Sequence, residues 1–548
     1  MSDSGLVGTL LRSWQLMYVV AVPLLLLPLP FYMQNKAGLS AYAMLWMAFY
    51  WTAEPIPLPV TALMPLVLFP LFGVLTTAET TKMYFNNIGF VMFGSLVVAA
   101  AVEVSNLHRR LAIGTLLTVG TSNRRLLFGF MLVTMFLSMW IPNTASASIM
   151  VPIVVAVLDQ VQALTKEAEV TVVCPVKSPG QPASVPVVEE ALQAENELHL
   201  FQMRKVMLLS VAYAANIGGT GSVIGTPPNL ILQALYIKQF NQDDLTFLAW
   251  MLYNVPPMLV CTSLAWLYTQ WIVAKLTPKG TERESREKIK LELERRYSSL
   301  GPMKFQEAAV LFLTCMLIIL WLTQNPRIIP GWAALFPYGR NLTSCVPAVL
   351  VTVLMFVVPK DPLRGSESLG LLTWEEANSK IHWGVVLIIC GGMTFAEASK
   401  VSGLSAILVD HLRALNVMPS YVVVSILCFS ASMLTEFTSN TAISAIMLPI
   451  VFEMAVALEV HPLYFAIPVT IACSFSFMLP AATPPNAIVF EMGNFKISDM
   501  ASPGFLMNMV CVTVELISIH TLGPLVFGVH DFPAWATQNN TETPAYSG

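Results

Sequence analysis

Two short polar motifs, each set in an uncharged apolar stretch, occur twice along this chain. Pro142-Asn143-Thr144 has its counterpart in Ser439-Asn440-Thr441, 297 residues later. The run from Gly225 to Asn229 (GTPPN) has its counterpart in the run from Ala482 to Asn486 (ATPPN), 257 residues later. Hydroxyl and amide groups are neutral donors for an anion, and their oxygens are acceptors that suit a small cation. Paired breaks at matching positions of two halves are typical of a transporter binding site.

Each motif interrupts a stretch that contains no charged side chain; these stretches are 126–158, 206–237, 437–452 and 462–490. A spanning helix that is broken within the bilayer is tolerated only where protein or a water-filled cavity covers the freed backbone groups. The breaks also have the features of helix starts, because Ser, Thr and Asn are favoured N-caps and Pro is favoured at the first helical position. We therefore expect four helix N-termini to converge near mid-membrane, where their free N–H groups and positive dipole ends favour an anion.

The four stretches contain no Lys or Arg that could neutralise a divalent anion. A compensating cation would then be held by carbonyl and hydroxyl oxygens at the same breaks, so co-transport with Na⁺ follows as a hypothesis. A single S-N-T motif in a membrane helix is more often a packing element, and a single T-P-P is usually a kink. Their fourfold arrangement in two repeats favours a binding site.

Membrane helices are the elements expected to position these motifs. Of the 548 residues, 55% are hydrophobic and 11% are charged, whereas soluble domains carry roughly 25% charged residues. Apolar runs close to the roughly 20 residues that span a bilayer recur along the chain, for example 14–33, 57–74, 307–323 and 502–529. The composition predicts an all-α polytopic membrane protein. No small-residue cleavage site follows the first run, so it is expected to be a spanning helix and not a signal peptide.

The composition of potential ligands argues against metal or enzyme chemistry. The eight cysteines are scattered without a C-x-x-C pair, and the seven histidines form no cluster, so neither a disulfide framework nor a metal centre other than sodium is expected. We expect no cofactor and no nucleic-acid partner. No H-E-x-x-H or comparable nucleophile constellation is visible, which disfavours an enzyme. A transporter-like receptor that binds without moving its ligand remains an alternative.

Polar segments set the expected topology. Residues 159–203 are acidic with a Pro-rich middle, which is typical of a flexible loop, and 275–304 mix Lys and Arg with Glu, which is typical of a charged surface helix. Basic segments, including 108–110, are expected on the cytoplasmic side. Asn341 and Asn539 each begin an N-x-[ST] glycosylation sequon, which is expected on the extracellular side. The N-terminus is then cytoplasmic and the C-terminus extracellular, with the plasma membrane as the expected location.

Several longer segments resemble the divalent anion/sodium symporter family, and most closely its animal sodium-coupled di- and tricarboxylate carriers. The resemblance covers nearly the whole chain. The matching segments are WTAEPIPLP (51–59), NLHRRLA (106–112), FLSMWIPNT (136–144), EFTSNTA (436–442) and CSFSFMLPAATPPNAIV (473–489), of which the last is the most specific.

The resemblance implies a homodimer whose protomers each have a fixed scaffold and a transport domain that moves across the membrane like an elevator. It implies two inverted repeats, with two re-entrant helical hairpins and two broken helices in the transport domain. By motif, the substrate contacts are Asn143, Thr144, Thr226, Pro227, Ser439, Asn440, Thr441, Thr483 and Pro484. One sodium site uses Ser138, Asn143 and the backbone near Gly225, and the other uses Thr435, Asn440 and the backbone near Ala482.

These features predict the following division of the chain: 1–120, scaffold helices and interfacial helix of the first repeat; 121–158, first re-entrant hairpin; 159–203, polar cytoplasmic insert; 204–242, first broken helix; 243–274, spanning helix; 275–305, charged cytoplasmic segment; 306–415, scaffold helices and interfacial helix of the second repeat; 416–460, second re-entrant hairpin; 461–500, second broken helix; 501–548, last spanning helix and extracellular tail.

The chain departs from the family pattern at a few positions. Pro142 replaces the Ser that normally begins the first motif, which removes a hydroxyl and an N–H and makes sodium binding there the point to test. Ser105 stands where the animal carriers usually have Trp, and Ala481 where the signature has a branched aliphatic residue. Ala145, after Asn143-Thr144, matches the carboxylate carriers, whereas the sulfate carriers tend to have Ser there.

Five carboxylates lie inside or at the ends of apolar runs, where ionisable residues are candidates for ion coupling. We expect Glu54 and Glu103 to pair with nearby basic groups. Glu436, three residues before Ser439, either accepts hydrogen bonds from the hairpin or takes part in coupling; Glu397 and Glu515 are left unassigned.

The predicted function is sodium-coupled symport of small divalent anions, succinate-like dicarboxylates or citrate. Two alternatives of the same fold remain, namely a sodium-independent dicarboxylate/citrate exchanger and a sodium-sulfate symporter.

Overall fold

The computed structural model describes residues 3–119, 123–172, 186–276, 282–325, 330–339, 342–363, 368–413 and 418–538. Over these residues the structure is helical, and its one β-type contact is an isolated bridge between Pro359 and Gly370. Both sequon residues, Asn341 and Asn539, lie outside the described residues.

The first half of the chain forms a series of helices that ends with a long, apolar one. These helices are α1 (Asp3–Leu26), α2 (Pro28–Met33), α3 (Lys36–Ala53), α4 (Leu58–Thr61), α5 (Pro65–Leu71), α6 (Thr77–Tyr84), α7 (Asn87–Val104), α8 (Leu107–Val119), α9 (Asn123–Ser138), α10 (Asn143–Val172), α11 (Pro186–Gly218), the short 3-10 turn η1 (Gly219–Gly221), α12 (Pro227–Phe240) and α13 (Phe247–Leu276).

The second half repeats much of this order after the linking helix α14 (Glu282–Ser299). Its elements are α15 (Phe305–Leu322), η2 (Trp332–Leu335), α16 (Cys345–Val357), α17 (Trp374–Lys380), α18 (Trp383–Val401), α19 (Leu404–Leu412), α20 (Ser420–Leu434), α21 (Asn440–Ala457), α22 (Pro462–Ala472), α23 (Pro484–Gly493), α24 (Ile497–Phe527) and α25 (Trp535–Gln538).

The repeat seen in the sequence is also a repeat of structure. α7 ends at Val104 and α18 at Val401, and the next helices, α8 and α19, begin at Leu107 and Leu404. Between them, Asn106 (φ 60°) and Gly403 (φ 77°) occupy the left-handed region, which Gly and Asn enter most readily. All these pairs keep the separation of 297 residues. The turn into each following helix is therefore made the same way in both halves.

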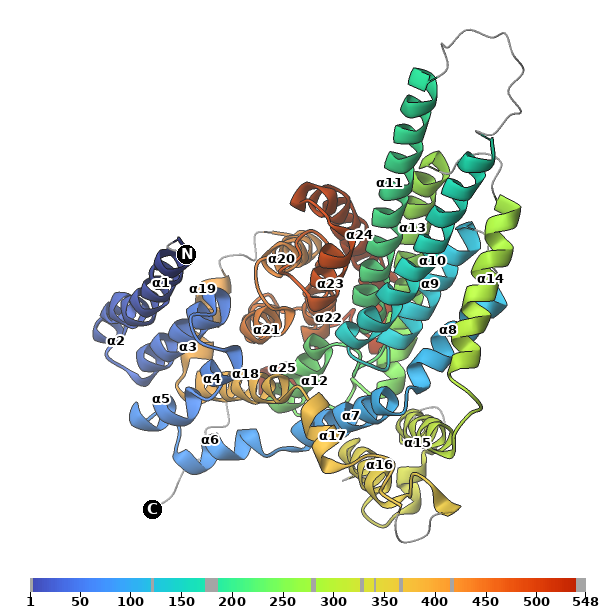
Figure 1. The fold of residues 1–548 in the computed structure, drawn as a ribbon. Helices are drawn as coiled ribbons and strands as arrows, with labels where there is room; N and C mark the ends of the chain where they lie inside the picture. Colours follow the sequence, from blue (N-terminus) through green and yellow to red (C-terminus); the bar gives the residue numbers. More distant parts are fainter. Residues whose placement is uncertain are drawn as a thin grey trace, which may run out of the picture.

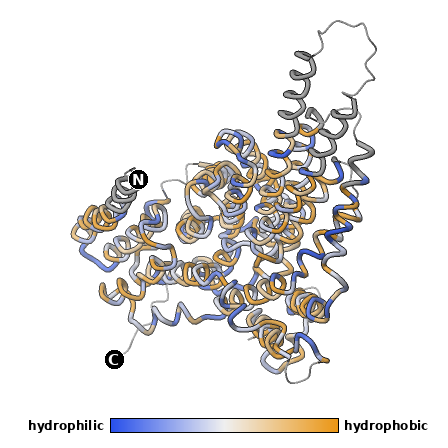
Figure 2. Tube along the Cα trace, viewed as in Figure 1, coloured by the Kyte–Doolittle hydropathy of each residue, from blue (hydrophilic) through white to orange (hydrophobic). Residues whose placement is uncertain are grey.

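Seven helical stretches of the described residues are long and apolar enough to cross a membrane: Trp14–Met33, Thr77–Val104, Phe247–Val273, Phe305–Leu322, Trp383–Val401, Asn440–Ala457 and Ile497–Phe527. Exposed side chains on the outer helices are often apolar, such as Met17 (68% exposed) and Leu25 (77%). Figure 2 shows hydrophobic residues along helices throughout the molecule. Such surfaces suit lipid and not water, which agrees with an integral multi-pass membrane protein.

Two expectations about elements are wrong. The apolar run 57–74 is not one spanning helix but the short helices α4 and α5, because Pro59, Pro65 and Pro70 each remove a backbone donor and restrict helix continuation. The insert 159–203 is not mainly loop, since α10 runs on to Val172 and α11 already begins at Pro186. The Gln-, Ala-, Leu- and Glu-rich flanks of the insert are good helix formers. By contrast, the charged helix expected within 275–304 is confirmed as α14.

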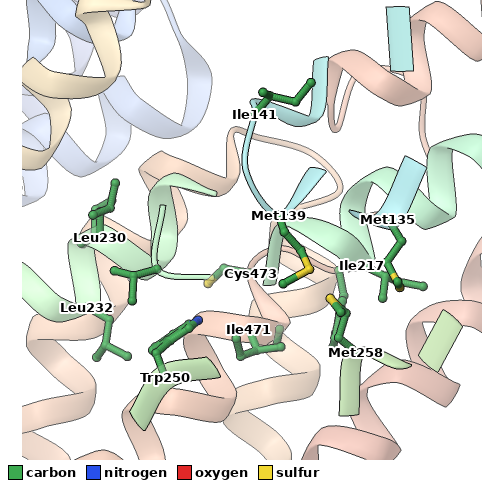
Figure 3. Packing of buried hydrophobic residues seen from close by; sticks show 14 of the residues in the cluster. Met135, Met139, Ile141, Ile217, Leu230, Leu232, Trp250, Met258, Ile471 and Cys473 are labelled. Atoms are coloured by element: carbon green, nitrogen blue, oxygen red, sulfur yellow. The ribbon is translucent and has the colours of Figure 1, made fainter. Parts of the chain in front are cut away.

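The helices that carry the motifs meet in the middle of the molecule (Figure 1). α9 packs against α10 and α11, α20 against α22, and α21 against α12 and α22. The two halves also interlock, because α10 and α11 both contact α23, and α12 contacts α18. Figure 3 shows Met139, Ile217 and Met258 together in the buried apolar packing around the first break.

Candidate functional site

A cavity of about 330 Å³ lies where the four motif segments meet. Its lining includes all nine residues that the motifs mark as substrate contacts: Asn143, Thr144, Thr226, Pro227, Ser439, Asn440, Thr441, Thr483 and Pro484. Of the predicted sodium ligands, Gly225 and Ala482 also line it, whereas Ser138 and Thr435 lie behind it and are fully buried. The fold thus gathers residues that are hundreds of positions apart in the sequence.

Four helices begin at this cavity, namely α10, α12, α21 and α23. Thr226 and Thr483 stand at the N-caps of α12 and α23. Both have nearly the same extended conformation, with φ of −145° and −143°. Neither threonine side chain caps its own helix, and neither does that of Ser439 before α21. These hydroxyls are therefore not consumed by capping, and the first N–H groups of α10 and α21 have no intrahelical acceptor. α12 and α23 each begin with two prolines, which have no N–H, so those two helix starts offer the threonine hydroxyl and the helix dipole. Hydroxyl and N–H donors both suit an anion.

A cluster of oxygen atoms lies beside the first motif. The Ser138 hydroxyl is 2.5 Å from Asn143 Oδ1 and 2.7 Å from the carbonyl oxygen of Ala215. One hydroxyl has a single proton, so it cannot donate fully to both acceptors. Three neutral oxygens around one position form a ligand set that suits a hard cation such as Na⁺.

The second motif has a matching cluster. The Thr435 hydroxyl is 2.6 Å from Asn440 Oδ1 and 2.8 Å from the carbonyl oxygen of Cys473. Ser476 adds a further hydroxyl, 3.4 Å from Asn440 Oδ1, whereas Gly219 stands at the matching place of the first half. The second cluster is therefore richer in oxygen than the first.

An asparagine fixes the backbone of each break. Asn229 donates from Nδ2 to the carbonyl oxygens of Gly219 (3.1 Å) and Ser222 (2.8 Å). Asn486 donates in the same way to those of Ser476 and Leu479, both at 3.0 Å. Buried backbone carbonyls in a broken helix need such partners. A Cβ at Gly225 would lie 2.4 Å from the Gly219 carbonyl oxygen, so the first break closes this tightly only with Gly at position 225.

One side chain joins the two halves across the site. Asn216, on α11 of the first half, donates from Nδ2 to the Ser476 carbonyl oxygen (2.9 Å) and the Thr483 hydroxyl (3.2 Å) of the second half. Its Oδ1 is buried and has no hydrogen-bond partner among the described residues. The motif comparison missed Asn216, although a buried amide in an uncharged stretch is a signal that could have marked it.

Known proteins match this chain over nearly its whole length. A family profile described as "Sodium:sulfate symporter transmembrane region" matches residues 10–529. The chain belongs to the sodium:sulfate symporter family.

Named relatives in this family align over almost their whole length. The chain is 35% identical to "Na(+)/dicarboxylate cotransporter 3" of Rattus norvegicus, covering 97% of this chain and 95% of the relative. It is 37% identical to "Solute carrier family 13 member 2" of Homo sapiens (97% and 96%) and 36% identical to "Na(+)/citrate cotransporter" of Rattus norvegicus (95% and 96%). The family is one of transporters, so the chain is not an enzyme.

A solved structure supports the fold. The crystal structure of the Alcanivorax borkumensis YdaH transporter matches with a TM-score of 0.50 at 14% identity, covering 83% of this chain and 88% of that one. At this identity the likeness concerns the fold alone.

The repeated motifs do not account for every residue of the cavity wall. Met92, Ser95 and Leu96 from α7 and His382 and Val385 at the start of α18 complete it. These residues lie in helices that carry no S-N-T or T-P-P motif, so nothing in the repeat analysis marked them. The lining contains no Asp, Glu, Lys or Arg.

The five carboxylates singled out in the sequence have distinct environments. Glu103 forms an ion pair with Lys380, as expected, whereas exposed Glu54 ends α3 at a positive φ and has no ion pair among the described residues. Glu397 pairs with Lys238, and Glu515 accepts a hydrogen bond of 2.7 Å from the Tyr253 hydroxyl.

Glu436 holds the second break together. Its buried carboxylate accepts the backbone N–H groups of Phe477 (2.7 Å), Met478 (3.1 Å) and Leu479 (3.1 Å), and the side-chain N–H of Asn508 (2.7 Å). A carboxylate with this many donors replaces the partners that the unwound backbone lacks. Glu436 is thus an acceptor, but its donors belong to the second broken helix and to α24 and not, as the sequence predicted, to the hairpin.

Proposed function

We propose that this chain is a sodium-coupled symporter of small divalent anions, namely succinate-like dicarboxylates or citrate. The observation that carries the proposal is a single cavity at which four helices begin and beside which two oxygen clusters lie. The nine residues lining it from the motifs would contact the anion, and the two clusters would each hold one Na⁺.

The charge balance favours coupling of the two ions. A doubly negative guest in a cavity whose lining has no Lys or Arg meets only partial positive charges from helix ends and neutral donors. Transfer of uncompensated charge from water into a membrane protein is costly. Cations bound at the neighbouring clusters lower that cost, so anion and Na⁺ should bind together.

The names of the relatives support the choice of substrate. Relatives that are 35–36% identical are named as Na(+)/dicarboxylate and Na(+)/citrate cotransporters. The near-complete alignment makes the same class of substrate the first to test here.

The movement and assembly proposed for this chain follow the same resemblance. The two hairpins, α9–α10 and α20–α21, and the two broken helices, α11–α12 and α22–α23, would move as an elevator past a scaffold that includes α7 and α18. The working unit would be a homodimer in the plasma membrane, with the N-terminus in the cytoplasm and the C-terminus outside.

A sodium-independent exchanger of the same fold is the second candidate, because Pro142 lacks the hydroxyl and N–H of the usual Ser. The geometry around Pro142 favours symport. Ala145 and Ser146 donate their N–H groups to the Pro142 carbonyl oxygen at 2.9 and 3.1 Å, so α10 starts normally. The Ser138–Asn143–Ala215 cluster is built without the side chain of residue 142.

The deciding experiment uses the full-length chain reconstituted into vesicles. Uptake of labelled succinate, citrate and sulfate is measured with an inward sodium gradient and with choline in its place, and protein-free vesicles are the control. We expect sodium-dependent uptake of succinate and citrate. Uptake that persists in choline and is accelerated by internal succinate would establish exchange instead. Saturable binding without flux under any gradient would indicate a receptor.

A further inference from the structure

The wall of the cavity contains one side chain with an ionisable ring, His382. It lines the same cavity as the two asparagine motifs, but it comes from the turn before α18 and not from a repeat motif. His382 is exposed, whereas the cavity residues Thr226, Thr441 and Thr483 are buried. The imidazole therefore lies at the rim of the cavity, and the motif donors lie deeper.

The backbone around His382 is held in place, so the ring has a defined position. The next residue, Trp383, donates its indole N–H to Asn378 Oδ1 at 2.8 Å and stacks on Phe93 of α7 with ring centroids 5.7 Å apart. Val385 donates its backbone N–H to the His382 carbonyl oxygen at 3.0 Å. These contacts fix the residue from both α17 and α7.

The imidazole ring of His382 has no structural role in the described part of the fold. It does not cap α18, and it makes no hydrogen bond or ion pair within the described ranges. Other histidines differ, because His108, His411 and His520 each have a ring nitrogen within 2.8 Å of a protein oxygen. The neighbouring Lys380 is not a competing cation for the cavity, since Glu103 pairs with it. An imidazole always keeps at least one N–H donor, and here that donor is free for a ligand.

The number of donor groups indicates what the ligand of His382 is. Each half of the chain contributes one Asn-Thr pair and one Thr-Pro helix start to the cavity, so the two sets match in number the two carboxylates of a dicarboxylate. A donor on a separate element at the rim gives the cavity one more group that an additional carboxylate of the substrate can bind. We propose that His382 is a specificity-determining residue that binds the third carboxylate of a tricarboxylate such as citrate. The inference rests on the proposed function and deepens it, because it assigns one residue of this chain to the third carboxylate of citrate.

The test compares two substrates in one protein. Vmax/KM for labelled succinate and for citrate is measured in vesicles at one pH for the wild type, His382→Ala and His382→Gln, with the amount of inserted protein determined for each. A hydrogen bond to a charged group corresponds to roughly a tenfold change. We expect His382→Ala to lower Vmax/KM for citrate about tenfold and for succinate less than about twofold. His382→Gln, which keeps an N–H donor, should retain part of the citrate activity.

The exposed histidine His411, whose Nδ1 faces the Ile407 carbonyl oxygen of its own helix, gives a matched control. His411→Ala should leave both substrates and their ratio unchanged. An equal loss of succinate and citrate uptake in His382→Ala and His382→Gln would mean that the residue is structural, and would overturn the inference while the proposed function stands. A wild type that transports succinate but not citrate would also overturn the inference while the proposed function stands. If the wild type transports neither, both proposals fail.

Discussion

Asn143 and Asn440 each serve two parts of the site at once. The amide oxygen of each lies within 2.6 Å of a hydroxyl in an oxygen cluster, and the residue also lines the cavity. An anion at the cavity and a cation at the cluster are therefore neighbours through one side chain. This shared ligand is the physical basis on which we expect the two ions to bind cooperatively.

Asn143→Ala and Asn440→Ala should each abolish sodium-dependent uptake while the protein still reaches the membrane. The loss of one amide removes a donor to the anion and an oxygen from the cation, and each such contact is worth about 1.5–3 kcal/mol. Uptake of labelled succinate per inserted molecule measures the effect. Normal uptake by either variant would refute the assignment of that motif.

Asn216 should couple the halves of the site through Thr483. Asn216→Ala removes the donor that positions the Thr483 hydroxyl, so the KM for succinate is expected to rise about three- to tenfold. In a double-mutant cycle with Thr483→Val the two effects should not add, with a coupling of at least about 0.5 kcal/mol.

Asn254 is the matched control for this cycle. It is also buried, and within the described part of the chain its amide donates to one acceptor, the Trp250 carbonyl oxygen of its own helix, at 3.2 Å. Asn254→Ala and Thr483→Val should have additive effects on KM. Additivity in the Asn216 cycle as well would mean that Asn216 does not act through Thr483.

At the scale of the element, the two hairpins begin their second helices in the same way but with different residues. Ser439 stands at the N-cap of α21 without using its hydroxyl for capping, and Pro142 stands at the corresponding place before α10. Position 142 is therefore free to vary as far as the helix start is concerned. What it changes is the set of donors and oxygens that the hairpin tip offers to ions.

Pro142→Ser should increase the apparent sodium affinity of uptake about two- to fivefold and leave the maximal rate nearly unchanged. The added hydroxyl oxygen is a potential Na⁺ ligand that the second half already has in Ser439, and one neutral polar contact contributes about 0.5–1.5 kcal/mol. Succinate uptake over a range of sodium concentrations gives the half-saturation value. An unaltered value would show that residue 142 does not face the first cation.

At the scale of the whole molecule, an ion pair links a broken helix to the helix that completes the cavity wall. Lys238 at the end of α12 lies 2.9 Å from Glu397 of α18, and both side chains are partly exposed. Next to Lys238, Gln239 donates to Glu453 of α21 at 2.9 Å. If α12 moves past α18 during transport, the Lys238–Glu397 pair must break in each cycle, so it stabilises one of the two orientations.

Glu397→Gln should shift the orientation of the cavity, and the charge exchange Lys238→Glu with Glu397→Lys should largely restore it. A pair worth about 1 kcal/mol changes the ratio of the two orientations about fivefold. The measurement introduces Ser95→Cys, a cavity position, and labels it with a membrane-impermeant maleimide, which reports the fraction of molecules whose cavity is open to the outside solution. The same variants with Ser95 intact are the control. Equal labelling with and without the pair would show that α12 and α18 do not separate there.

The sequence alone predicted much of this protein. Its charge content and apolar runs indicated a helical membrane protein, because lipid excludes charged and unpaired backbone groups. The recurrence of the Asn-Thr and Thr-Pro-Pro motifs identified the four segments that meet at the cavity, since their arrangement in two repeats favours a binding site over isolated packing elements or kinks.

Only the tertiary structure revealed the contacts between elements that lie far apart in the sequence. The bond of Asn216 to the opposite half, the fastening of the second break by Glu436 and the place of His382 on the cavity rim depend on how helices pack, and no local pattern encodes that. The division of the run 57–74 is a different case, because its prolines are visible in the sequence and hydropathy alone outweighed them in the prediction. Periodicity and composition describe one segment at a time, whereas a binding site is a relation between several.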